Sequence, residues 1–384
     1  MPDLPTPSAN TPATRLATRL AFLVAGFGIA CWAPLVPFAK LRLGVDDATL
    51  GLLLLCLGIG SVVAMLATGP LSARYGTKPV IVGGGLGLAI VLPLLTVAAS
   101  PATLGAALFL FGAALGSIDV AMNVHAVEVE RDSDRPLMSG FHALFSIGGF
   151  AGSVLTTFLL SYGVTPLVAT LVAAAIMAAA TIAAAPRLLA TSGNGEGPIF
   201  AFPRGVVLLL AGLTAVTFLT EGAMLDWSAL LITDLGLAAR DQAGLGYILF
   251  AIAMTAGRFG GDALTARFGD VRVLVWGGAL AVAGFVLLLA TAVPTVALAG
   301  FLLIGFGASN VVPVYFRLAG VQTAMPAALA VGAITTTGYA GILVGPAGIG
   351  FVAQALGLPA AFWLLAGLMV LVPMTARFVA GDRP

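Results

Sequence analysis

The sequence has few charged residues, and this scarcity excludes a water-soluble globular domain. Only 9% of its 384 residues are Asp, Glu, Lys or Arg, whereas 60% are hydrophobic. Soluble domains carry about 25% charged residues. The mean hydropathy of +1.10 indicates the same deficit of polar surface. We therefore expect most of the chain to lie in lipid.

Several motifs that would indicate enzymes or other classes of protein are also absent. There is no Gly-rich loop for a nucleotide phosphate, so we expect no direct use of ATP. There is no metalloprotease or serine-hydrolase motif and no Cys/His cluster, so we expect neither an enzyme nor a cofactor. Cys31 and Cys56 lie within apolar runs, where small packing residues are commoner than disulfides. The net charge of +1 gives no reason to expect a nucleic-acid partner.

The apolar residues form twelve runs, each long enough to cross a bilayer as a helix. A helix of about 20 residues spans the hydrocarbon core. No run shows the alternation of a β-barrel strand, and helices satisfy their own backbone in lipid. We therefore predict an all-α membrane protein with spans at 17–40, 47–73, 78–99, 102–127, 137–162, 165–186, 205–234, 242–267, 271–291, 294–318, 326–355 and 358–378.

The positive residues between the spans predict the orientation of the chain. Most Arg residues lie in breaks on the side of the two termini, whereas only Lys40, Arg42 and Arg240 lie on the opposite side. Cytoplasmic loops carry the excess of Lys and Arg. Both termini are therefore predicted to be cytoplasmic, in a multi-pass protein of the cell inner (plasma) membrane.

An internal repeat divides the chain into two six-span bundles. A shift of 193 residues aligns Ala73-Arg74 with Ala266-Arg267 and Gly76 with Gly269. Because each half has six spans, a pseudo-two-fold axis along the membrane normal is expected. We predict an N-terminal tail (1–16), two bundles (17–186 and 205–378), a cytoplasmic linker (187–204) and a C-terminal tail (379–384).

The loop between spans 2 and 3 resembles that of the major facilitator superfamily. Its Gly, Arg, Gly and Lys positions are Gly69, Arg74, Gly76 and Lys78, while Ala73 stands where the family has an acid. The resemblance covers nearly the whole chain. It implies two pseudo-symmetric six-helix bundles and transport by alternating access.

Further stretches resemble the fucose-permease-like branch, which includes MosC-type proteins linked to rhizopine, an inositol derivative. They are residues 119–128, 138–142, 221–228, 307–313 and 338–346. The branch implies a sugar or cyclitol as solute, with acids on spans 1 and 4 handling protons. Span 1 has no acid here, so Glu221 is the candidate to replace it.

Polar side chains on spans 4 and 7 are the first candidates for a solute or proton site. Asp119 and Asn123 lie on the same face of a helix as two glycines. They therefore either line a cavity or form structural hydrogen bonds to a neighbouring span. We predict proton coupling at Asp119 and Glu221, and solute binding at Asn123 and Glu221. A neutral structural role is the alternative for Glu221, and a contact at the helix end is favoured for Asp226.

Three further residues each have a functional and a structural interpretation. Asn310 binds solute or stabilises a kink beside Pro313. Trp32 stacks on a sugar ring or anchors the span at the interface. His142 pairs with Asp119 and titrates in the working range, or packs as a neutral ring. For His125, a gate or structural contact is expected.

Charged residues near the two repeated loops are expected to have gating or structural roles. Arg258 and Asp262 lie one helical turn apart and are placed to neutralise each other. The same gating or structural role is expected for the basic residues in the two copies of the loop, Arg74, Lys78 and Arg267.

Together these patterns predict a secondary transporter for a small polar solute, working as a proton-coupled symporter. The predicted partners are the solute, protons and the lipid bilayer, and a monomer is expected. A proton-driven exporter of drugs or metabolites is the first alternative, and a membrane sensor with a transporter fold is the second.

Overall fold

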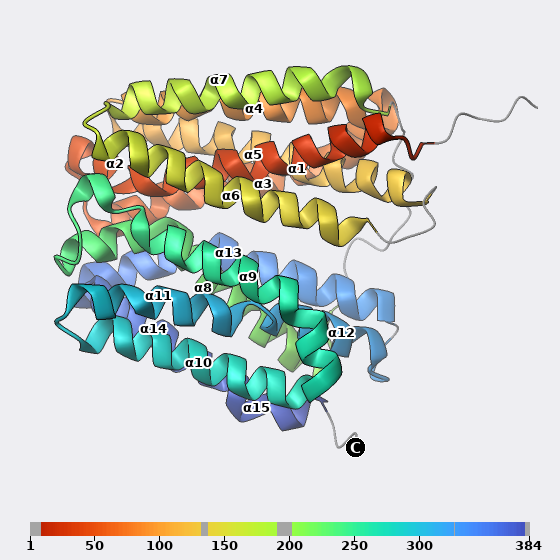
Figure 1. Cartoon of the computed structure of the whole chain (residues 1–384), viewed down its shortest axis with the longest axis vertical. Coiled ribbons are helices and arrows are strands. Elements are labelled where there is room, and N and C mark those ends of the chain that lie inside the picture. Colours follow the sequence, from red (N-terminus) through yellow and green to blue (C-terminus); the bar gives the residue numbers. More distant parts are fainter. Residues whose placement is uncertain (1–8, 132–136, 190–201, 326, 381–384) are drawn as a thin grey trace, which may run out of the picture. The chain divides into compact units, whose positions relative to one another are not determined.

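A computed structural model describes residues 9–131, 137–189, 202–325 and 327–380, and every regular element in these ranges is a helix (Figure 1). The α-helices are α1 (Pro12–Trp32), α2 (Val36–Leu43), α3 (Asp47–Tyr75), α4 (Thr77–Val97), α5 (Pro101–Arg131), α6 (Met138–Ser161), α7 (Pro166–Ala184), α8 (Val206–Asp234), α9 (Leu245–Phe268), α10 (Asp270–Ala290), α11 (Pro294–Ala308), α12 (Val311–Val321), α13 (Ala327–Leu356), α14 (Leu358–Met369) and α15 (Leu371–Ala380). Short 3-10 turns are η1 (Ala33–Leu35), η2 (Ala185–Arg187) and η3 (Arg240–Gln242).

The described residues contain 12 helical segments long and apolar enough to cross a membrane. Each one overlaps a predicted span, so the all-α fold with twelve spans is confirmed. Large apolar side chains cover much of the outer surface; Trp276 and Tyr162, for example, are 73% and 75% exposed. Such exposure is unfavourable in water and is expected for helices whose solvent is lipid.

The first helix begins earlier than the predicted span, at Pro12 instead of residue 17. The reason is a local cap. The hydroxyl of Thr11 accepts a hydrogen bond from the Thr14 backbone N–H at 3.1 Å, and the Thr14 hydroxyl accepts one from Thr11 N–H at 2.9 Å. Proline at the first helical position fits this geometry. Two predicted segments lie partly outside the described residues. They are the N-terminal tail, at residues 1–8, and the linker, at residues 190–201.

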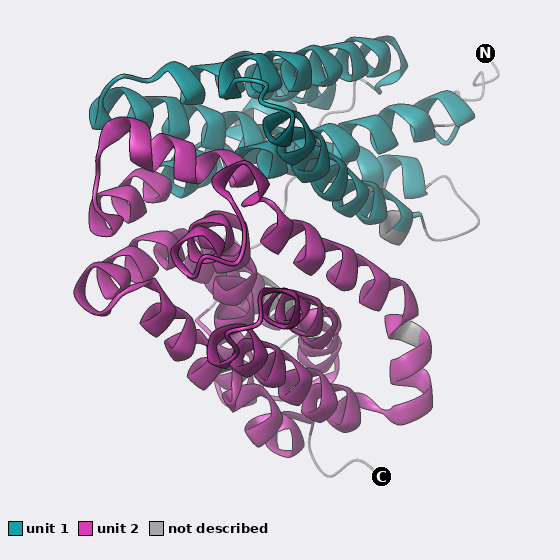
Figure 2. Cartoon of the chain, turned by 60° about the vertical axis from the view of Figure 1, so that its left-hand side comes forward, with its two compact units in different colours: residues 1–32, 56–196 teal, residues 33–55, 197–384 magenta. Residues whose placement is uncertain are grey.

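Two compact units divide the chain, and they do not follow the sequence halves completely. Unit 1 contains residues 1–32 and 56–196, and unit 2 contains residues 33–55 and 197–384 (Figure 2). Residues 33–55 come from the first half of the sequence. In the structure they pack with helices of the second half, because η1 and α2 lie against α8.

The internal repeat is visible in the backbone. Among the described residues, six of the seven glycines with a positive φ form three pairs, each close to the 193-residue shift. The φ angles within each pair agree to about 12°: Gly44 (61°) with Gly236 (65°), Gly76 (82°) with Gly269 (79°), and Gly163 (77°) with Gly357 (89°). A positive φ strains any residue with a Cβ atom. The same turns therefore need glycine at the same places in each half.

The repeat also governs how helices pack within each unit. In unit 1, a Cβ atom on Gly112 would collide with the carbonyl oxygen of Leu57. In unit 2, a Cβ on Gly305 would collide with the carbonyl oxygen of Phe250, and both of these residues lie 193 positions further along. Small residues allow such close approach of helices in membranes, where burial of apolar surface supplies little driving force.

Candidate functional site

An ion pair joins α8 to α9 inside unit 2. The guanidinium of Arg258 lies 3.3 Å from Oε2 of Glu221, and the two side chains are 39% and 22% exposed. Charges within a bilayer are costly and are found paired or facing a cavity. Arg258 thus has an ion-pair partner on another span. The sequence had predicted a partner on its own helix, Asp262. The side chain of Asp262 lies outside the described part of the structure, so the pair within the helix stays a prediction.

Two more titratable groups lie near this ion pair. Asp226 follows Glu221 on α8 and is only 8% exposed. Its carboxyl group makes no hydrogen bond or ion pair with a described residue. Tyr247, on α9, lies within electrostatic range of Glu221, Arg258 and Asp226. Arg258 therefore pairs with Glu221, and Asp226 is the acid that is left without a direct partner among the described residues.

The residues next to Asp226 carry unused donors. The indole N–H of Trp227 and the hydroxyl of Ser228 are buried and have no hydrogen-bond partner among the described residues. Buried polar groups almost always find a partner in the protein or in bound molecules. This stretch of α8 is therefore suited to bind water or a hydroxyl-bearing solute.

In unit 1, α5 carries the predicted stripe. The amide nitrogen of Asn123 donates to the backbone carbonyl of Asp119 at 2.8 Å, within the same helix. The carboxyl group of Asp119 makes no hydrogen bond or ion pair with a described residue. Both side chains are half-buried. The stripe thus offers a carboxyl group and the carbonyl end of an amide.

Trp32 and His142 lie elsewhere in unit 1. Trp32 is fully buried, which is inconsistent with an anchor at the membrane interface. Its indole N–H has no hydrogen-bond partner among the described residues. The ring of His142 meets Phe22 of α1 edge-on, with 5.0 Å between ring centroids. The predicted pairing of His142 with Asp119 stays a prediction.

Asn310 lies between α11 and α12, where the tenth span is interrupted. Its amide nitrogen donates to the carbonyl of Gly257 on α9 and to the hydroxyl of Ser309, both at 3.0 Å. A Cβ atom at Gly261 would collide with its oxygen. These contacts support the kink-stabilising alternative, and a role in solute binding stays a prediction.

His125 is buried and joins three segments of unit 1. Its Nε2 accepts a hydrogen bond from the backbone N–H of Leu189 at 2.9 Å, and its Nδ1 lies 3.1 Å from the Thr18 hydroxyl. Thr18 in turn donates to the carbonyl of Thr14. This network suits the neutral ring with its proton on Nδ1. His125 therefore makes a structural contact, as expected from the sequence.

The two copies of the loop are built alike. The guanidinium of Arg74 lies over the Tyr75 ring at 5.2 Å, and that of Arg267 lies over the Phe268 ring at 5.4 Å. Lys78 is half-buried in the first turn of α4. In the second copy, Asp270 forms an ion pair with a residue of α12, Arg317. This link was not predicted from the sequence.

At the opposite end of unit 2, the segment 33–55 packs tightly on the second half. Lys40 forms an ion pair with Asp47 at 2.5 Å. On α3, a Cβ atom at Gly51 would lie 2.7 Å from the carbonyl oxygen of Pro346 on α13. A Cβ on Gly350 would lie 2.5 Å from the carbonyl oxygen of Asp47. The backbones of α3 and α13 are therefore in direct contact at this end of unit 2.

Twelve apolar helices, built as a repeat with acids and an arginine inside the spans, define a multi-pass membrane protein of the transporter class. The family model of the Major Facilitator Superfamily matches residues 19–320, and the chain belongs to this family. An uncharacterized MFS-type transporter of Yersinia pestis is 51% identical over 366 residues, 95% of each chain. The membrane protein MosC of Rhizobium meliloti is 31% identical over 380 residues, 96% of this chain and 91% of its own.

Solved structures agree on the fold. A crystal structure of a mutant of the nucleoside transporter NupG has a TM-score of 0.78 at 12% identity, covering 96% of this chain and all of that one. The human organic anion transporter MFSD10 has a TM-score of 0.63 at 17% identity over 97% of this chain and all of its own. These likenesses concern the fold, whereas the family model and the relatives make the chain a Major Facilitator Superfamily transporter.

Tyr247 is the residue near the ion pair that sequence reasoning missed, whereas Asp226 was expected to make a contact at the helix end. The helical spacing of Asp226 placed it away from Glu221, and Tyr247 gave no signal on a separate span.

Proposed function

We propose that this transporter moves a small polar solute, of the sugar or cyclitol type, across the inner membrane by proton-coupled symport. The observation that carries the proposal is the Glu221–Arg258 ion pair between α8 and α9, with Asp226 and the unused donors of Trp227 and Ser228 close by in sequence. Hydroxyl groups of a solute both donate and accept, so they suit this mixture of carboxylates, N–H groups and a hydroxyl.

The ion pair also supports a coupling step. When Glu221 takes up a proton, it no longer attracts the guanidinium of Arg258 as an ion. Arg258 then becomes free to donate hydrogen bonds to a solute oxygen. Asp119 on α5 supplies a second carboxyl group without a described partner, and we propose that it carries the coupling proton together with Glu221. His142 is proposed to assist Asp119.

The packing of segment 33–55 supports alternating access. Its backbone lies directly against that of α13, at the end opposite the Arg-rich loops. In an alternating-access cycle one end opens while the other is closed. We propose that Gly51 and Gly350 form the closed gate of one state, with the Arg-rich end and both termini in the cytoplasm.

Uptake into proteoliposomes tests the proposal. The purified protein would be reconstituted and offered radiolabelled sugars and cyclitols, with and without an inward proton gradient. We expect accumulation of at least one solute to depend on the gradient. Asp119→Asn and Glu221→Gln should abolish accumulation, whereas exchange of solute without a gradient should persist because it needs no net proton movement.

The matched control is Asp241→Asn, an acid in η3 at the very start of a span, which should leave accumulation unchanged. If both Asp119→Asn and Glu221→Gln accumulate solute like the unmodified protein, the coupling assignment is wrong. If no sugar or cyclitol enters, the substrate class is wrong.

A proton-driven exporter is the second candidate, favoured by the acid without a direct described partner at Asp226, which could bind a cationic compound. The same vesicles distinguish it, because an exporter moves solute against the direction of the proton gradient. A protein that senses solute without moving it would bind solute but show neither uptake nor export.

A further inference from the structure

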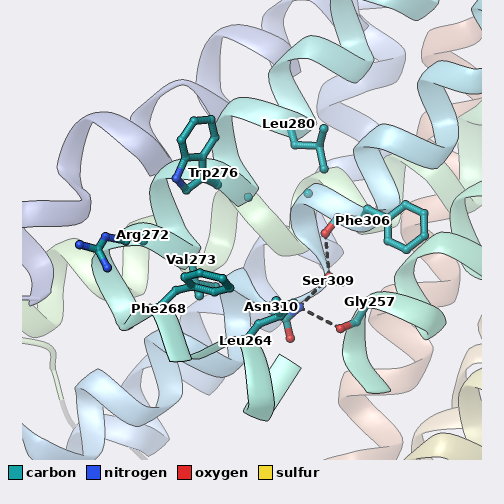
Figure 3. A pocket seen from close by; sticks show the side chains of 12 residues that line it. Gly257, Leu264, Phe268, Arg272, Val273, Trp276, Leu280, Phe306, Ser309 and Asn310 are labelled. Atoms are coloured by element: carbon teal, nitrogen blue, oxygen red, sulfur yellow. Dashed lines mark hydrogen bonds between the residues drawn. The ribbon is translucent and has the colours of Figure 1, made fainter. Parts of the chain in front are cut away.

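A groove on unit 2 is lined by neither Glu221 nor Arg258, although Ser309 and Asn310, described above, form part of its lining. Its volume is 430 Å³, within the range of about 300–1,000 Å³ typical of small-molecule sites. The walls are α9 and α10, and the floor is formed by α11 and the break that follows it (Figure 3).

Apolar side chains with a large exposed fraction line most of this groove. Phe268 and Leu264 of α9 are 43% and 44% exposed, Phe306 of α11 is 44% exposed, and Trp276 of α10 is 73% exposed. In a chain that spans the bilayer, a groove with such walls is suited to hold hydrocarbon. A Trp on the outer wall is typical of the interface between acyl chains and headgroups.

The rim at the loop end is positively charged. Arg272, in the first turn of α10, lines the groove, and its guanidinium extends outward from the apolar wall (Figure 3). Arg272 makes no ion pair with a described residue. The acid nearest in sequence, Asp270, is already bound to Arg317. Arg267, beside Phe268, adds a second guanidinium that makes no ion pair with the part of the chain described.

We propose that this groove binds an anionic phospholipid, with the headgroup phosphate on Arg272 and one acyl chain between α9 and α10. Basic pockets between membrane helices are suited to anionic headgroups. From Arg272 to Leu280, α10 rises about 12 Å, so the upper part of an acyl chain fits along it. At the floor, a hydrogen bond from Asn310 ties the broken tenth span to Gly257 of α9. A bound lipid would therefore brace the α9–α10 pair, in a site separate from the Glu221–Arg258 pair.

Lipid binding to the purified, delipidated protein tests the proposal. Native mass spectrometry and thermal unfolding in detergent would be measured with phosphatidylglycerol, phosphatidylcholine or water-soluble glycerol phosphate. We expect phosphatidylglycerol to be retained and to raise the unfolding temperature. Phosphatidylcholine should do so more weakly. Glycerol phosphate should have no effect, because it lacks the chain that fills the groove.

Two variants and a control make the test specific. Arg272→Gln should weaken phosphatidylglycerol binding about five-fold, the effect of one charge near a headgroup. Leu264→Trp should fill the groove and displace both lipids without disturbing buried packing. Arg187→Gln, an exposed arginine of unit 1, should bind like the unmodified protein. Equal binding of both lipids, or unchanged binding in Arg272→Gln, would overturn the proposal.

Discussion

Gly112 and Gly305 occupy equivalent places in the two halves, and each meets the carbonyl of an equivalent residue, Leu57 or Phe250. In contrast, Arg258 of the second half corresponds to Met65 of the first, and Glu221 corresponds to Gly28. The comparison shows that the halves share close helix contacts, whereas the Glu221–Arg258 pair inside the spans belongs to the second half alone. Helix contacts that depend on the absence of a side chain tolerate little change, whereas a polar group can be placed in one half alone.

The largest expected effect comes from the shared contacts. Gly112→Ala and Gly305→Ala should each lower stability by about 1–3 kcal/mol, because an added methyl group forces two backbones apart. Thermal unfolding in detergent measures the loss. Gly83→Ala is the control, since nothing lies within 4 Å of a Cβ atom there. If Gly112→Ala and Gly83→Ala unfold at the same temperature, the shared packing does not support the fold.

The next effect tests the ion pair that only the second half has. Arg258→Met, which copies the first half, should leave Glu221 without its partner and lower the unfolding temperature by about 3–6 °C. The double variant Arg258→Met with Glu221→Gln should recover most of this loss, because it removes the unpaired charge. A double variant less stable than Arg258→Met would show that the two side chains do not act as a pair.

A smaller effect tests a contact that only the first half has. His125 corresponds to Leu318, and His125→Leu removes the acceptor for the Leu189 N–H and the partner of Thr18. The cost of a buried unpaired donor is about 1–3 kcal/mol, and relaxation at Leu189 should keep it near the lower end. Thermal unfolding measures the loss, and Leu318→Ile is the control. Unchanged stability of His125→Leu would show that the ring is not a structural contact.

The smallest effect concerns Asp46, which lies between the first two spans. Hydrogen bonds from the side chain and backbone of Thr49 lower the pKa of its carboxyl group below the ordinary value of 3.8. A lowered folded pKa means that the stabilisation is present at neutral pH and is lost as pH falls through the folded pKa. Asp46→Asn should remove this dependence while changing the unfolding temperature at pH 7 by less than about 2 °C. A steeper loss between about pH 5 and 3 in Asp46→Asn than in the unmodified protein would contradict this assignment.

Most of the fold was predictable because membrane spans are local features. Each span is a long apolar run, and the break at Gly76 recurs at Gly269 with the same positive φ. The candidate site was less predictable. The spacing of Arg258 and Asp262 suggested a pair within one helix, yet Arg258 reaches Glu221 on α8, 37 residues earlier in the chain. The spacing of residues along one helix does not determine which other helix packs against a given side chain.

The sequence by itself determined that this chain lies in lipid as twelve helices in two related halves. Apolar length and the shortage of charge are properties of each segment, and lipid leaves helix as the structure that satisfies the backbone. Only the tertiary structure decided that segment 33–55 packs with the second half, that Asn310 ties a kink to α9, and that Asp226 has no direct partner among the described residues. These depend on contacts between distant segments, which form when glycine-lined helices approach each other closely.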